Sequence, residues 1–150
     1  MNYELYMSAA LAEARSAGAA SERPDGAVAV MDDAMVARGH EQVLAAGDPT
    51  AHAPMVVLRA AARRLGQTSL SGLTLFTVRE PCPMCVGALI AADADGIVYA
   101  LADPAGACGS AMQLAGANGP GRRVEVVAGI MQGAAAEIVG TLAAAGRPGR

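Results

Sequence analysis

Two cysteines and one distant histidine place the strongest constraint on how this chain can fold. Cys82 and Cys85 lie in the segment Pro81-Cys82-Pro83-Met84-Cys85, and His52 precedes them by about thirty residues. Two thiolates and one imidazole supply three ligands of a tetrahedral Zn²⁺, which leaves the fourth position for water. This donor set is typical of a catalytic zinc site, because structural sites usually fill all four positions with protein. The fold must therefore bring the two segments to one point.

The apolar periodicity predicts helices that alternate with strands. Helical spacing covers residues 2–19, 51–65, 82–92, 109–115 and 132–145, and extended patterns cover 27–31, 35–37, 73–78, 97–101 and 124–130. Strands that alternate with helices in the second half favour a mostly parallel sheet with helices on both faces. We expect one domain over residues 1–145, since this length is sufficient for one core, and a loose tail over 146–150.

This element order places His52 at the start of one helix and both cysteines at the start of the next. If these two helices lie side by side, their N-termini bring the three ligands together. The positive end of a helix dipole also lowers the pKa of nearby thiols, which favours metal binding. A lone C-x-x-C is weak evidence, and a redox pair or a structural pair is the competing interpretation. Cys108 stands alone and is expected to be a small buried residue.

Composition narrows the classes of function. All eleven basic residues are Arg, and the absence of Lys excludes Schiff-base chemistry and a Walker-A phosphate loop. A net charge of −3 does not indicate a polyanion-binding surface, and one Phe without any Trp argues against a base-stacking platform. No apolar run reaches the ~18 residues of a membrane span, and no export signal is recognised. C-x-x-C spacing indicates a reduced compartment, so we expect a cytoplasmic protein.

Four segments together resemble the cytidine-deaminase-like zinc deaminases, nearest the tRNA-adenosine and guanine deaminase branch. They are Pro24-Asp25-Gly26-Ala27-Val28, Asp48-Pro49-Thr50-Ala51-His52-Ala53, Glu80-Pro81-Cys82-Pro83-Met84-Cys85 and Gly106-Ala107-Cys108-Gly109-Ser110. They run in the order of the family, and the resemblance covers most of the chain, from about residue 3 to 142. The resemblance implies a three-layer α/β/α fold with a five-stranded mixed sheet, one Zn²⁺ held by His52, Cys82 and Cys85, and usually a homodimer.

The chain departs from the family pattern at Pro54. The resemblance implies a glutamate two residues after the zinc-binding histidine, which carries protons from the attacking water to the ring nitrogen and the leaving amine. Pro54 has no acid or base, and general acid–base help is worth roughly 10²–10⁴-fold in rate. We therefore expect a protein that keeps zinc and deaminates poorly by the usual route. As a residue of the first helical turn, Pro54 is equally well explained by structure alone.

The substrate-binding residues are also altered. The resemblance places Ala53 and Pro81 at the substrate, and Glu41 where this branch carries a purine-binding Asn. An ionised Glu only accepts hydrogen bonds, whereas Asn also donates, so the substrate is expected to differ. Glu41 is either a replacement proton carrier or a solvated loop carboxylate, and Asp103 is a weaker candidate at the rim.

Three functional hypotheses follow. The first is a zinc-dependent hydrolytic deaminase of a small-molecule substrate, namely an amino-substituted nucleobase, nucleoside or related nitrogen heterocycle. Action on tRNA is less expected, because the chain is acidic and the basic spots at Arg122-Arg123 and Arg147 to Arg150 are small. The second is a catalytically inactive zinc-binding protein or ligand-binding subunit, which the loss of the acid at Pro54 favours. The third is the redox or structural role for the cysteine pair.

Overall fold

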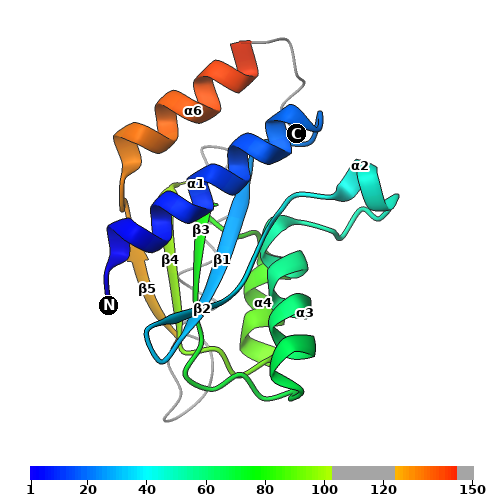
Figure 1. The fold of residues 1–150 in the computed structure, drawn as a ribbon, viewed down its shortest axis with the longest axis vertical. Coiled ribbons are helices and arrows are strands. Elements are labelled where there is room, and N and C mark those ends of the chain that lie inside the picture. The colour runs from blue at the N-terminus through cyan, green and yellow to red at the C-terminus, as the bar shows by residue number, and fades with distance from the viewer. Residues whose placement is uncertain (103–123, 145–150) are drawn as a thin grey trace.

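A computed structural model describes residues 1–102 and 124–144, which form one five-stranded mixed sheet with helices on both sides (Figure 1). The strands are β1 (Gly26–Met31), β2 (Ala34–His40), β3 (Thr74–Arg79), β4 (Gly96–Leu101) and β5 (Glu125–Ala128). The helices are α1 (Tyr3–Ala19), α2 (Val43–Ala46), α3 (Ala53–Leu65), α4 (Pro83–Ala91) and α6 (Gln132–Ala144). The predicted fold class is confirmed.

The sheet has the order β2-β1-β3-β4-β5. Strand β1 pairs antiparallel with both β2 and β3, whereas β3, β4 and β5 run parallel. Helix α4 connects the parallel strands β3 and β4, as a parallel pair requires. The predicted parallel arrangement of the second half is therefore confirmed, and the first hairpin makes the sheet mixed.

Alternation along the strands divides the core into two layers. Val28, Phe76 and Val98 belong to the cluster that packs beneath α1 and α6. Their sequence neighbours, such as Leu75 and Ile97, belong to the cluster that packs against α3 and α4. Successive side chains of a strand point to opposite faces of the sheet. Because consecutive residues of these strands are both apolar and buried, both faces need helices to cover them. Figure 1 shows α1 and α6 on one face and α3 and α4 on the other.

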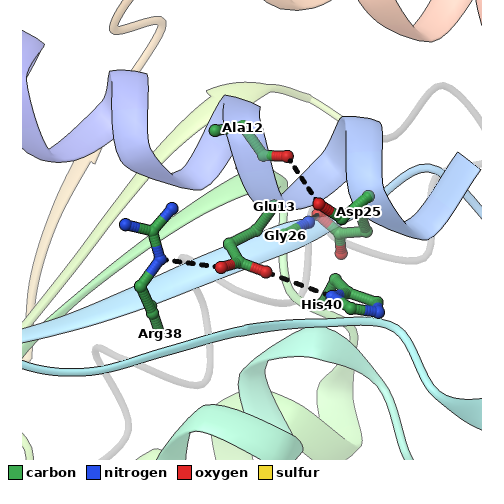
Figure 2. A network of polar contacts seen from close by, with 7 residues as sticks. Ala12, Glu13, Asp25, Gly26, Arg38 and His40 are labelled. Atoms are coloured by element: carbon green, nitrogen blue, oxygen red, sulfur yellow. Dashed lines mark hydrogen bonds and ion pairs between the residues drawn. The ribbon is translucent and has the colours of Figure 1, made fainter. Parts of the chain in front are cut away.

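Helix α1 lies directly on the start of β1. A Cβ atom added at Gly26 would lie 2.4 Å from the carbonyl oxygen of Ala10 and 2.5 Å from the backbone nitrogen of Ala14. Glu13 of the same helix accepts from Arg38 Nε at 2.7 Å and lies 3.1 Å from His40 Nδ1, as Figure 2 shows. These contacts fix the position at which the chain enters β1, immediately after Asp25.

The structure differs from the sequence prediction between the first hairpin and α3. The predicted loop contains the short helix α2, whose free amides at Leu44 and Ala45 donate to the Glu22 carboxylate at 2.9 and 2.8 Å. This cap comes from a residue more than twenty positions away, which local patterns cannot reveal. Strand β2 is also longer than the predicted 35–37, because its backbone pairs with β1 at positions that lack apolar residues.

Several predictions fall outside the described residues. They are the helix at 109–115, Asp103, Cys108 and the tail at 146–150. The division into one domain over 1–145 and a tail therefore stays a prediction. Within the described ranges, none of the helices combines the length and the apolar character that crossing a membrane requires.

Candidate metal centre

The three predicted ligands lie at the N-termini of two neighbouring helices. His52 is the N-cap residue of α3, and Cys82 is the N-cap residue of α4. Cys85 lies one turn into α4 and is buried. Both N-cap residues have extended backbone, and a proline follows each within two residues, where the missing amide hydrogen costs no helical hydrogen bond. Helices α3 and α4 are in contact, so their first turns meet at one point, as predicted.

The ligand atoms have the spacing of a tetrahedral zinc site. Cys82 Sγ lies 3.6 Å from Cys85 Sγ and 3.6 Å from His52 Nδ1, and Cys85 Sγ lies 3.8 Å from His52 Nδ1. Tetrahedral bonds of about 2.3 Å to sulfur and about 2.0 Å to nitrogen require roughly 3.8 Å between sulfurs and roughly 3.5 Å between sulfur and nitrogen. No fourth His, Cys, Asp or Glu of the described residues joins this group. The residues therefore fit Zn²⁺ with one ligand position free of protein.

The two thiols differ in acidity. Hydrogen bonding from Cys85, followed by His52, lowers the pKa of Cys82 to about 5. The hydrogen bond to Cys82 and then burial raise the pKa of Cys85, and the charge of Asp25 adds to the increase. These two directions favour a thiolate at Cys82 and a thiol at Cys85 in the protein without metal. A bound divalent cation takes the place of the thiol proton, which couples metal affinity to pH.

A small cavity opens beside the ligands. Its volume is about 20 Å³, which is sufficient for one water-sized group. Of the residues that the structure describes, the others that line it are Arg23, Asp25, Pro54, Glu80 and Pro81.

The remaining predicted site residues are distributed differently. Pro54 and Pro81 line the cavity, and Pro54 is buried. Ala53 is fully buried in the first turn of α3. Glu41 is 1% exposed and is not one of the described residues that line the cavity, but its backbone amide donates to the carbonyl of Asp25 at 3.2 Å. The catalytic and substrate-binding roles of these four residues stay predictions.

Asp25 is a cavity residue that the sequence reasoning did not select. It is 4% exposed, and burial raises its pKa to about 7, against the lowering influence of Arg23. The charge of Glu41 raises the pKa further, whereas the backbone amide of Arg79 lowers it by donating to Oδ1 at 3.1 Å. A carboxylate immediately before the buried strand Gly26–Met31 was the signal that could have identified it, since ionised groups are rarely buried there without a purpose.

The comparisons with known proteins identify the family. The family model for the cytidine and deoxycytidylate deaminase zinc-binding region matches residues 1–101, and the chain belongs to this family of zinc-dependent hydrolytic deaminases. The tRNA-specific adenosine deaminase of Bacillus subtilis (strain 168) is 38% identical over 130 residues, covering 86% of this chain and 81% of that protein. The guanine deaminase of the same organism is 40% identical over 101 residues, covering 67% and 65%.

A solved structure supports the same assignment. It comes from studies of A-to-I editing by tRNA:A34 deaminases at the wobble position of transfer RNA. It matches with a TM-score of 0.81 at 36% identity and covers 89% of this chain and 98% of its own. The predicted family, fold class and zinc cofactor are therefore confirmed, and His52, Cys82 and Cys85 are placed to hold the ion.

Proposed function

We propose that this protein catalyses the hydrolytic deamination of an amino-substituted nucleobase. The observation that carries the proposal is the triangle of His52 Nδ1, Cys82 Sγ and Cys85 Sγ, whose sides of 3.6, 3.6 and 3.8 Å match a zinc site with one open position. When bound there, Zn²⁺ lowers the pKa of a water molecule and so makes it nucleophilic near neutral pH.

The protein residues hold and orient the reacting groups. Hydrolysis forms a bond between the water oxygen and the ring carbon, and breaks the bond from that carbon to the amine, which leaves as ammonia. One water proton goes to the ring nitrogen and the other to the departing amine. The N-termini of α3 and α4 fix the ligands, and the buried Pro54 and Pro81 line the cavity beside them.

The form of the substrate is a separate part of the proposal. A net charge of −3 favours a free base or nucleoside, because a tRNA-binding surface needs basic residues to contact phosphates. Relatives at 38% and 40% identity are named for tRNA adenosine and for guanine, so the aminated base is the shared feature. A homodimer and a cytoplasmic location remain part of the proposal on the basis of the family resemblance and the reduced cysteines.

The test is ammonia release by zinc-loaded protein. Guanine, adenosine, cytidine and an RNA anticodon stem-loop with adenosine at the wobble position form the panel. Turnover of a base or nucleoside but not of the stem-loop supports a small-molecule substrate. Turnover of the stem-loop alone identifies RNA as the substrate. Because the chain has two histidines, His40→Ala is a matched control for His52→Ala, which alone should abolish zinc binding and turnover. If no compound of the panel releases ammonia while one zinc is bound per chain, the proposed deaminase activity is refuted.

The second candidate is a zinc-binding protein without catalysis, and Pro54 is the observation that favours it. This protein would retain the ligand triangle and the small cavity, and would bind an aminated base without changing it. Guanine bound to the zinc-loaded protein and recovered intact after hours supports this candidate. Zinc-dependent conversion of the same ligand rejects it.

A further inference from the structure

The cavity beside the ligand triangle needs a group that accepts and returns protons, and position 54 does not supply one. Hydrolysis moves two protons from one water to two nitrogens, and neither can pass through a proline side chain. Two carboxylates of the described residues do line the cavity, Asp25 and Glu80, which are 4% and 7% exposed. Glu41, the candidate taken from the sequence, does not line it.

Asp25 is held in an orientation that suits a proton carrier. Its Oδ1 accepts from the backbone amides of Gly26 at 3.0 Å and Arg79 at 3.1 Å, and lies 3.4 Å from Thr77 Oγ1. All three hydrogen bonds that the described residues make to this carboxylate go to Oδ1. One oxygen therefore anchors the side chain at the junction of β1 and β3, and none of the described residues forms a hydrogen bond with Oδ2.

The place of Asp25 in the cavity also fits this role. Asp25 is not part of the ligand group, but it lines the same cavity as all three ligands, and its charge contributes to the raised pKa of Cys85.

We propose that Asp25 is the proton carrier of this cavity and acts from the β1 side in the place that Pro54 leaves without an acid. The inference rests on the proposed deaminase function. Asp25 accepts one proton from the attacking water and delivers it to the ring nitrogen. It then accepts the second proton from the newly formed hydroxyl and delivers it to the amine as the carbon–nitrogen bond breaks, so the carboxylate ends in its starting state.

The first experiment does not depend on activity. Protein loaded with Co²⁺ is titrated from pH 5 to 9 while its visible absorption is recorded. Asp25→Asn should move the midpoint of the spectral change by at least one pH unit. Asp32→Asn is the matched control, because it makes the same chemical change at an exposed position with a positive φ of 51°, which Asn tolerates, at the far end of β1. An unmoved midpoint in Asp25→Asn overturns the proposal.

The second experiment separates proton transfer from a structural role. Asn retains the Oδ1 acceptor, so Asp25→Asn should fold, and its kcat should fall at least 10²-fold with KM changed less than threefold. In a Pro54→Glu background, the same substitution should cost less than threefold, because a second carboxylate is present. An equal loss in both backgrounds shows that Asp25 only supports the structure and overturns the proposal.

Two further arms complete the test. Asp25→Glu should restore part of the rate lost in Asp25→Asn and thereby support the proposal, and Glu80→Gln is measured in parallel. If kcat falls strongly in Glu80→Gln but not in Asp25→Asn, the proton carrier is Glu80, and the proposal for Asp25 is overturned. If no variant deaminates any compound of the panel, the proposed function fails, and the cobalt titration alone decides whether Asp25 acts on the open ligand position.

Discussion

Replacing Pro54 by glutamate is the most informative perturbation of the site. Pro54 is buried in the first turn of α3 and lines the 20 Å³ cavity beside the ligands, so we expect a glutamate at this position to reach the cavity. We expect kcat/KM to rise on the order of 10²-fold, which corresponds to about 2.7 kcal/mol of activation free energy. The backbone is expected to tolerate the change, because amides in the first helical turn have no intrahelical partner.

The same substitution has an expected cost in the absence of metal. It buries a second carboxylate beside Asp25, whose pKa is already raised to about 7 by burial. We expect the metal-free protein to lose about 1–3 kcal/mol of stability, or several degrees in Tm, and zinc to restore it. Pro54→Gln is the matched control, because it has the same size and no ionisable group. Equal rates for the Glu and Gln variants, with zinc bound in both, would refute the reasoning.

Three other predictions follow from the described contacts. Zinc binding at pH 8 should release about one proton, from Cys85, because Cys82, with a pKa of about 5, is already ionised at that pH. Calorimetry in buffers of different ionisation enthalpy measures the number of protons released. Gly26→Ala should lower the free energy of unfolding by about 3 kcal/mol in urea titrations, because its Cβ would lie 2.4 Å from a backbone oxygen of α1. Glu13→Gln should cost on the order of 1 kcal/mol at pH 7. Burial acts to raise the pKa of Glu13, but the hydrogen bonds from Arg38 and His40 outweigh it and lower the pKa. This contribution is present above the unfolded value of 4.5 and is lost as pH falls through the folded pKa, so wild type and variant should converge in acid.

Most of the fold was predictable because its signals are local. The buried strands carry short apolar runs, and both ligand-bearing helices begin beside a proline, which marks a helix start within a few residues. The short helix α2 was missed, since its cap is the Glu22 carboxylate, more than twenty residues away. The length of β2 was underestimated because pairing with β1, rather than its own composition, extends it to His40.

The candidate site was predictable only in part, for the same reason. Cysteine and histidine spacing identifies the ligands, because their chemistry is specific and their helix starts are readable from the chain. The local signal of Asp25, a carboxylate immediately before a buried strand, is weaker, since its importance comes from lying on a cavity that the ends of β1, β3, α3 and α4 build together.

The sequence by itself determined the alternation of elements, the three candidate zinc ligands and the absence of an acid at position 54, since each is a property of residue types at given spacings. Only the tertiary structure decided which carboxylates share the cavity with those ligands. Burial of Asp25 beside Cys85, and the exclusion of Glu41 from the same cavity, depend on how strand and helix ends converge, and that convergence arises from packing between segments distant in the chain.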